Sequence, residues 1–439
     1  MLKNKDYGAL EEKYMNRINL KLDKPYYDGS VQKLYDVPDH PELLISETTA
    51  GGSVFDVGTI FNIEGSDIGR ASFRHLVFQE LQSPEAWSDL SKHISQESSL
   101  VQKDDSGLVE NVLSGFCKKG APTHHAGMVD RDSGEVYSQG FPEKLSNLTL
   151  IKKYDIIKPE LKKVLGWHFY DYKKYHGRDG NVIPLEYIVR LGVTSGSSIL
   201  KKFNRLSDSD KSAYLNELGV DALNPWTRFD PPIVDLTTKY EPEDRNISRQ
   251  EAALISSLDG EAFSRSLVMA ALGAYLLQQI FSKMGLFLWD LKWELAKDGE
   301  NLVFVDTIDT DSVRVTYNIS RDNKTYFVHF NKQAMRDYYK IMHGDWLNAV
   351  NDAKKKAAQS GRPFTEILSE GQQKNEYAKT PDVDKSFLDI QTAKFNMIQS
   401  FVKNKEQGLT KEADRIAQEE LDYYLSSNKK EEYEALNSV

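Results

Sequence analysis

Residues 286–308 read LFLWDLKWELAKDGENLVFVDTI, two apolar runs separated by the polar segment KDGE at 297–300. An Asp-Gly pair between two such runs is typical of a β-hairpin. Because successive side chains of a strand point to opposite faces, Asp290, Lys292 and Glu294 are predicted to share one face. In such a hairpin Asp306, on the second strand, comes opposite this row. The stretch therefore predicts a sheet with one apolar and one charged face.

The charged row admits two interpretations. Carboxylates at this spacing can bind Mg²⁺ through hard oxygen ligands, and a neighbouring Lys can neutralise a phosphate. The alternative is the solvent-facing polar side of an amphipathic hairpin, and composition alone favours this alternative.

The surrounding sequence predicts a mixture of helices and strands. Residues 264–284 form the strongest helical pattern, with Gly285 as a C-terminal cap. The strand predicted at 182–189 is followed by small residues at 194–198, where backbone amides can approach an anion. Further predictions are short strands at 33–37, 43–48 and 53–57, a helix at 69–81, a mobile polar insertion at 85–107, helices after Lys332, and two amphipathic helices with solvated charge within 387–424. The division expected from this pattern is a β-rich lobe at 1–180, an α/β lobe at 181–345 and a helical extension at 346–439.

Composition excludes several classes of protein. The 439 residues carry 56 basic and 66 acidic side chains, a formal charge of −10, and the two signs are interleaved. Binding to nucleic acid is not expected, because it needs a clustered basic face. The single Cys117 rules out an internal disulfide and predicts a reducing compartment. No signal peptide is visible, and the apolar segment at 263–291 is interrupted by charged residues, so we expect a cytoplasmic protein without a membrane span.

Two other segments are open to both a functional and a structural interpretation. Adjacent His124 and His125 suggest a metal site, but sequence neighbours rarely share one ion, so a structural loop is favoured. The segment from Lys239 to Asp244 could position a polar substrate, and an ordinary loop would look the same.

Taken in chain order, several short segments resemble the SAICAR synthetase family, the phosphoribosylaminoimidazole-succinocarboxamide synthases. The segments that carry the resemblance are 28–35, 53–57, 120–124, 183–190, 196–197, 237–247, 285–294, 306, 311–314 and 331–337. The resemblance covers about residues 25 to 340.

The resemblance implies an α+β fold with an N-terminal antiparallel β lobe, a larger α/β lobe, and ATP in the cleft between them. It implies that ATP phosphorylates the carboxylate of carboxyaminoimidazole ribonucleotide (CAIR), and that the amine of L-aspartate then displaces phosphate to give SAICAR in purine biosynthesis. Mg²⁺ and cationic side chains would offset the crowded anions. The partners implied are these small molecules, with no nucleic acid and no membrane; formation of a homo-oligomer is left open.

By position in the family's motifs, residues of four kinds are implied. The implied metal ligands are Glu294 and Asp306. The implied catalytic residues are Lys292, Asp306 and Arg190. The implied substrate contacts are Arg190, Ser195, Ser197, Asp311, Arg314 and Asp244. The implied nucleotide contacts are Gly29, Lys33, Glu186, Lys239 and Lys292.

The sequence also departs from the family's pattern. The family usually has Lys after the first glycine and a basic residue two positions later, where this chain has Ser30 and Gln32. Lys33 is shifted by one, which in a strand turns it to the opposite face. The family usually has a second acidic residue directly after the position of Asp306, where this chain has Thr307. Asp309 could compensate for the missing carboxylate. These departures keep two alternatives open: a ligase of the same fold with another acid or amine, and a nucleotide-binding homologue without catalysis.

Overall fold

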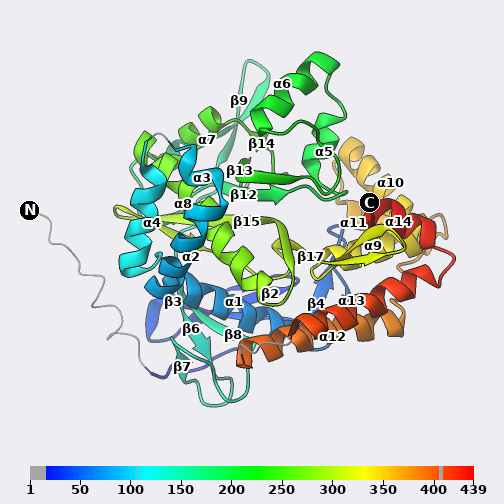
Figure 1. The fold of residues 1–439 in the computed structure, drawn as a ribbon, viewed down its shortest axis with the longest axis horizontal. Helices are drawn as coiled ribbons and strands as arrows, with labels where there is room; N and C mark the ends of the chain where they lie inside the picture. Colours follow the sequence, from blue (N-terminus) through cyan, green and yellow to red (C-terminus); the bar gives the residue numbers. More distant parts are fainter. Residues whose placement is uncertain (1–15, 105, 405–408) are drawn as a thin grey trace, which may run out of the picture.

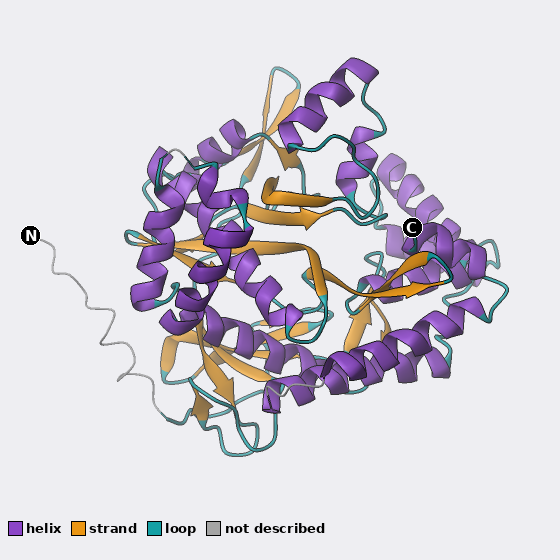
Figure 2. Cartoon of the chain, in the orientation of Figure 1, coloured by secondary structure: helices purple, strands orange, loops and turns teal. Residues whose placement is uncertain are grey.

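The computed structural model describes residues 16–104, 106–404 and 409–439. The larger of two antiparallel sheets lies at the centre of the molecule among helices, and the N-terminal sheet lies at its lower edge in the view of Figures 1 and 2. The fold is α+β, as predicted. The largest apolar core cluster includes residues from Val54 to Tyr433 and draws on the second sheet and on the C-terminal helices. The N-terminal sheet has a separate cluster, which includes Ile45, Val129 and Leu148.

The N-terminal sheet has six strands in the order β1-β2-β3-β8-β6-β7. Their bounds are β1 Tyr27–Asp28, β2 Gln32–Val37, β3 His40–Thr48, β8 Leu148–Lys152, β6 His125–Val129 and β7 Val136–Tyr137. Helix α1, Ser66–Gln82, packs against β3, β6 and β8. A two-stranded ribbon of β4 (Gly51–Ser53) and β5 (Thr59–Asn62) precedes it. The strand predicted at 53–57 is wrong beyond Ser53, because Phe55 and Asp56 have positive φ and form a turn.

The second sheet has eight strands and contains the hairpin predicted at 286–308. Its main path is β14-β13-β12-β15-β17-β18, and β11 and β16 also pair with β15. The bounds are β11 Asn181–Val182, β12 Leu185–Gly192, β13 Arg228–Thr238, β14 Asn246–Ile247, β15 Phe287–Asp298, β16 Asn301–Val305, β17 Val313–Arg321 and β18 Lys324–His329. Helix α8, Gly260–Ser282, contacts β12, β13 and β15.

The alternative interpretation, that this charged row is a solvent-facing side of the hairpin, is wrong for Asp290 and Glu294. Asp290 and Glu294 are only 6 % and 5 % exposed. Leu291, Trp293 and Leu295, on the alternate face, belong to the apolar core, as the period-two pattern predicts. The charged row therefore lies on a covered face, where carboxylates need partners.

The prediction of a mobile polar insertion at 85–107 is also wrong. They form α2 (Pro84–Glu97) and α3 (Ser99–Gln102), which are followed by α4 (Leu108–Lys119). Trp87, Leu90 and Ile94 of α2 are fully buried, and the Trp87 ring packs on Phe116 of α4 with 4.7 Å between centroids. Their spacing of three and four residues is helical and could have been recognised.

The remaining elements surround the second sheet or extend it. They are β9 (Glu160–Val164), β10 (Trp167–Asp171), the 3-10 helix η2 (Lys173–Tyr175), α5 (Ser198–Phe203), α6 (Asp208–Leu218), α7 (Arg249–Ser256), α9 (Gln333–Met342), α10 (Gly344–Ser360), α11 (Phe364–Gln373), α12 (Lys385–Asn404), α13 (Leu409–Leu425) and α14 (Lys430–Asn437). The two predicted C-terminal helices are α12 and α13, and α12 lies along α1 (Figure 1). Their charge is not all solvated, since Lys394 and Glu420 form a buried ion pair. Among the described residues no helix is long and apolar enough to cross a membrane.

Candidate active site

Polar side chains from adjacent strands meet on the charged face of the second sheet. The register pairs Arg190 of β12 with Asp290 of β15, and Ile188 with Lys292. Because alternate residues share a face, Glu186 and Arg190 lie on the same face as Asp290, Lys292 and Glu294. Two groups of contacts form along this face.

The first group, the lysine–carboxylate cluster, consists of Glu186, Lys239, Lys292, Glu294 and Asp306. The Nζ atom of Lys292 donates to Glu186 Oε1 at 2.7 Å and to Glu294 Oε1 at 3.0 Å. Lys239 donates to the same two oxygens at 3.0 and 2.7 Å. Asp306 Oδ2 lies 3.9 Å from Lys292 Nζ. The predicted association of the β15 row with Asp306 is therefore confirmed.

This cluster carries an excess of negative charge. Three carboxylates face two ammonium groups, and Glu186 and Glu294 are buried. Burial and the neighbouring Asp306 carboxylate raise the pKa of Glu294. Burial opposes the positive charge of Lys292, but Glu294 and Asp306 outweigh burial and raise its pKa. The arrangement favours the arrival of another cation.

Asp244 lies near this cluster, in the loop after β13. Burial and the charge of Glu186 raise the pKa of its carboxyl group. Burial also acts to raise the pKa of Glu186, but Lys292 and Lys239 outweigh burial and lower that pKa. Asp244 is thus a further acidic group at the edge of the cluster.

A cleft between the two sheets opens onto Glu294 and Asp306. Its cavity volume is about 130 Å³, smaller than that of a usual small-molecule site. Its walls are largely apolar. The lining residues from the N-terminal lobe include Gln32, Leu34, Leu44, Arg74, His124 and Ile151, and those around the second sheet include Tyr154, Val182, Tyr240, Glu294, Val305 and Asp306. The cleft therefore has an apolar wall and a charged end.

The second group, the arginine cluster, consists of Arg190, Asp235, Asp290 and Arg314. Arg190 is 2 % exposed and donates from Nε to Asp235 Oδ2 at 2.6 Å. Its other two nitrogens donate to the hydroxyls of Ser197 and Ser198, both at 3.2 Å. Arg314 Nη1 donates to Asp290 Oδ2 at 2.6 Å. Arg190 thus lies beside a loop of small residues and shares Asp290 with Arg314, an arrangement that suits the binding of an anionic group.

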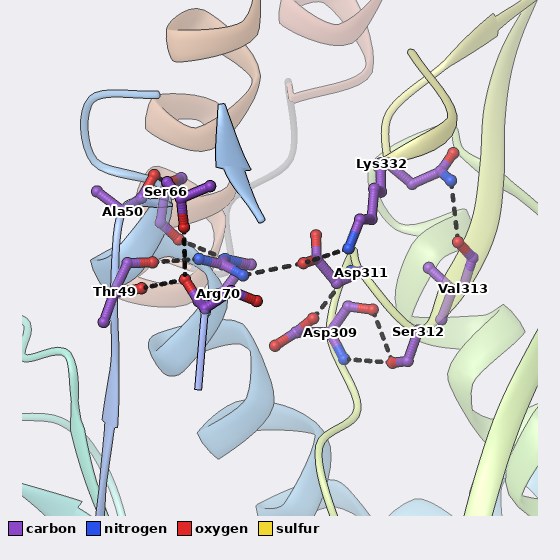
Figure 3. Close-up of polar contacts among 12 residues, drawn as sticks. Thr49, Ala50, Ser66, Arg70, Asp309, Asp311, Ser312, Val313 and Lys332 are labelled. Atoms are coloured by element: carbon purple, nitrogen blue, oxygen red, sulfur yellow. Dashed lines mark hydrogen bonds and ion pairs between the residues drawn. The ribbon is translucent and has the colours of Figure 1, made fainter. Parts of the chain in front are cut away.

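The turn between β16 and β17 connects the two clusters and is anchored to α1 (Figure 3). Asp311 Oδ2 accepts from Arg70 Nη1 at 3.0 Å and lies 3.6 Å from Lys332 Nζ. Arg70 also donates to the backbone carbonyls of Thr49 and Ser66. Within the turn, the Asp309 carboxylate accepts from the Asp311 backbone N–H at 2.9 Å. The turn is therefore fixed by Arg70 of α1 and by Lys332.

Three of the predicted site residues lie apart from these contacts. Lys33 is ion-paired with Asp28 at 3.4 Å, and the cleft is lined by its neighbours Gln32 and Leu34, so Lys33 faces away as its shift by one residue predicts. Gly29 lies in the turn before β2 and donates its N–H to the carbonyl of Gln32 at 2.9 Å. Ser195 lies in the turn before α5, whereas Ser197 is fully buried.

The donor set at Glu294 and Asp306 fits a magnesium ion that also binds phosphate oxygens. Among the described residues no group of three or more His, Cys, Asp or Glu side chains is arranged to hold a metal ion. Mg²⁺ is commonly bound by one or two carboxylates, with phosphate and water completing its shell. Two carboxylates at the charged end of an otherwise apolar cleft meet that requirement. These residues would hold the ion, and the ion would neutralise phosphate charge.

His124 and His125 lie in the interior. Their rings pack on Phe78, with centroids 5.3 and 5.1 Å away, and His125 Nε2 lies 2.6 Å from His75 Nδ1. Burial lowers the pKa of His124 to about 3 and holds that of His125 well below its usual range. These neutral, packed rings agree with the structural interpretation of the pair.

Comparison with known proteins supports the resemblance found in the sequence. The family model for SAICAR synthetase matches residues 138–353. Over these residues the chain resembles the SAICAR synthetase family. A phosphoribosylaminoimidazole-succinocarboxamide synthase of Thermoplasma acidophilum is 29 % identical over 205 residues, and a relative from Archaeoglobus fulgidus with the name of that enzyme is 30 % identical over 238 residues. These matches cover 46 % and 54 % of this chain and 62 % and 64 % of the relatives, so the chain spans less than two thirds of either curated relative.

Solved SAICAR synthetase structures show a more distant likeness. A SAICAR synthase from Saccharomyces cerevisiae in complex with SAICAR has a TM-score of 0.46 and 18 % identity, covering 89 % of this chain and 99 % of that chain. A SAICAR synthetase in complex with ADP has a TM-score of 0.41 and 18 % identity, covering 71 % of this chain and 89 % of that one.

Several residues of the site were missed by the sequence analysis. Asp235 is the closest ionic partner of Arg190, and Arg70, Arg74 and Lys332 hold the turn between the clusters. The alternation of β13 could have indicated Asp235, because it is four residues from Lys239 and shares its face. No local signal indicates Arg70 or Arg74, whose partners lie 241 and 235 residues away along the chain.

Proposed function

We propose that the protein is an ATP-dependent ligase that joins CAIR and L-aspartate to give SAICAR in purine biosynthesis. The observation that carries the proposal is that the lysine–carboxylate cluster and the arginine cluster lie side by side on one face of a single sheet. An apolar cleft ends at the first cluster, and a loop of small residues ends at the second. The match to the family model and the names of the curated relatives support the same reaction.

In this proposal the cleft binds ATP, with the base against the apolar wall and the phosphates toward Glu294 and Asp306. These carboxylates hold Mg²⁺, and Lys292 offsets the charge of the transferred phosphoryl group. Gly29, Glu186 and Lys239 belong to the nucleotide side. Lys33 keeps a nucleotide role only if β2 shifts its register, because its ammonium faces away from the cleft.

The arginine cluster receives the ribonucleotide. The guanidinium groups of Arg190 and Arg314 bind its phosphate, and Ser195 or Ser197 contributes from the adjoining loop. Asp311 binds a donor group of the same substrate, and Asp244 lies toward the amino acid. A carboxylate oxygen of CAIR attacks the γ-phosphorus and ADP leaves; the aspartate nitrogen then attacks the acyl carbon and phosphate leaves.

Omission of one substrate at a time tests this proposal. Phosphate release is measured with ATP and Mg²⁺ while CAIR or L-aspartate is left out in turn. Release that needs both substrates, together with formation of SAICAR, is the expected result. Release that is unaffected by CAIR, or none with both substrates present, would overturn the proposed reaction.

A ligase with a different acid or amine is the second candidate. It is favoured by Gln32 and Thr307, which line the cleft where the family pattern has charged residues. For this candidate we expect nucleotide to raise the melting temperature while CAIR and L-aspartate leave phosphate release unchanged. Nucleotide binding with no phosphate release for any acid and amine tested would favour a homologue without catalysis.

A further inference from the structure

Arg74 of α1 is a buried cation at the charged end of the cleft. It lines the cleft together with Glu294 and Asp306, and its side chain is only 4 % exposed. Its Nη2 donates to Asp309 Oδ2 at 2.6 Å, and its buried Nε has no hydrogen-bond partner in the described part of the chain. A buried donor without an acceptor costs free energy. Arg74 therefore has an unused donor on a side chain that lines the cleft.

The other cations near the cleft have partners or lie farther out. Lys152 is bonded to Asp298, and Lys153 pairs with Asp36 and lies over the ring of Tyr26. The side chains of both lysines are about one third exposed, at 33 % and 30 %. Lys33 faces away from the cleft. The position on β2 that does face it holds Gln32, which is neutral.

The pairing with Asp309 leaves Arg74 able to bind an anion. A guanidinium group has five N–H donors in a fixed plane, and Asp309 uses a donor on Nη2. Asp309 is 2 % exposed and is part of the rigid turn that begins after Asp306. The carboxylate therefore orients the guanidinium group relative to the metal-ligand candidates and leaves the Nε–H donor unused.

We propose that Arg74 binds the polyphosphate of the nucleotide in this cleft, donating Nε–H to a phosphate oxygen while Asp309 positions it. The inference rests on the proposed function in taking ATP as the occupant of the cleft. The family pattern has basic residues where this chain has the neutral Ser30 and Gln32. The inference assigns their cationic role to a residue of helix α1. Arg74 contacts the substrate, and Asp309 acts through Arg74.

The test is direct binding of ATP, ADP, AMP and adenosine in the presence of Mg²⁺, without CAIR or L-aspartate. Replacing Arg74 alone leaves a buried carboxylate unpaired, so the main variant is the double substitution R74Q/D309N, which removes both charges. We expect this variant to weaken the binding of ATP at least about tenfold, to weaken the binding of AMP less, and to leave the binding of adenosine unchanged. The variant D309N keeps the Arg74 donor, and we expect it to weaken the binding of ATP less than about threefold.

Two further variants make the result specific. Q32K in the R74Q/D309N background puts a cation on the strand position that faces the cleft, and partial recovery of ATP affinity is expected. R131Q, which removes an exposed ion pair with Glu47 in the same lobe, is the control for general effects. The inference would be overturned if R74Q/D309N lost affinity equally for all four ligands, or if its ATP affinity stayed within twofold of that of the wild type. A wild-type protein that binds no nucleotide would also overturn it. Intact ATP binding without CAIR-dependent phosphate release would instead overturn the proposed reaction and leave the role of Arg74 standing.

Discussion

Lys292 Nζ and Asp306 Oδ2 lie 3.9 Å apart, so the two groups attract each other without a hydrogen bond. Lys292 already donates to Glu186 and Glu294 at 2.7 and 3.0 Å. Asp306 is therefore the carboxylate of this cluster that is least engaged with lysine. It is also the most exposed of the three, at 36 %. Both properties suit a ligand that must accept an incoming ion together with phosphate.

The substitution Asp306→Asn should remove Mg²⁺-dependent turnover and leave the fold intact. The neutral amide binds a hard cation poorly, and we expect kcat to fall about a hundredfold or more. Asp306 has a φ of 63°, in the left-handed region, which Asn adopts as readily as Asp, so thermal stability should change little. Phosphate release and melting temperature are measured together, with D422N at an exposed ion pair as the control. Full activity of D306N would overturn the metal assignment.

The substitution Arg190→Ala should raise the KM for the ribonucleotide about tenfold or more and leave the KM for ATP within about twofold. Arg190 carries a charge between Asp235 and Asp290 and fixes the hydroxyls of Ser197 and Ser198. Because its loss leaves buried charge uncompensated, R190K serves as a second variant. Lys keeps the positive charge but lacks the two parallel donors of the guanidinium group. Compared with R190A, R190K should therefore recover more of the stability than of the KM for the ribonucleotide. An unchanged ribonucleotide KM in both variants would contradict the substrate assignment.

The local pattern of the chain predicted the part of the site that lies on one hairpin. The two-residue period of a strand is sufficient to place Asp290, Lys292 and Glu294 together, and the Asp-Gly turn brings Asp306 across from them. The same period predicted that Lys33 faces away from Gln32. These relationships depend only on neighbours in sequence.

The contacts between the lobes could not be predicted in this way. Arg70 and Arg74 read as ordinary helix residues, and only the packing of α1 against the turn at Asp309–Ser312 gives them partners. Burial of the charged row was missed for the same reason, because a strand pattern does not show what covers its polar face. For α2 the helical spacing of Trp87 and Leu90 was present, but the polar composition of the segment obscured it.

Buried histidines should make the protein sensitive to mild acid. Burial lowers the pKa of His75 and His329 to about 4 and that of His124 to about 3, and His125 is shifted in the same direction. The folded state keeps these rings neutral, whereas the unfolded chain takes up protons below its usual value of about 6.5. The contribution of these histidines to the free energy of unfolding is therefore fully present above pH 6.5 and is lost as the pH falls toward 4. Four such groups give a slope of roughly 5 kcal/mol per pH unit near pH 5.

Urea unfolding at pH 7.5, 6.5 and 5.5 checks this expectation. H75Q should reduce the slope by about one quarter, because one of four protons no longer contributes. H93Q removes an exposed histidine and should leave the slope unchanged. A free energy of unfolding that is constant from pH 6.5 to 5.5, or an H75Q slope equal to that of wild type, would contradict the role of the buried rings.

The buried pair of Lys394 and Glu420 should be a main attachment of the C-terminal helices. Lys394 Nζ on α12 donates to Glu420 Oε2 on α13 at 2.5 Å and to the His329 carbonyl of β18 at 2.6 Å, and both charged side chains are at most 4 % exposed. K394M leaves the Glu420 carboxylate buried with Gln391 as its remaining side-chain donor, and we expect a loss of about 3–5 kcal/mol in the free energy of unfolding. K394M/E420M removes both charges and should recover at least about 1 kcal/mol of that loss. The measurement is urea unfolding at pH 7.5, with K403M on the exposed side of the last turn of α12 as the control. If K394M costs no more than K403M, or if the double variant is less stable than K394M, the pair is not what holds these helices to the sheet.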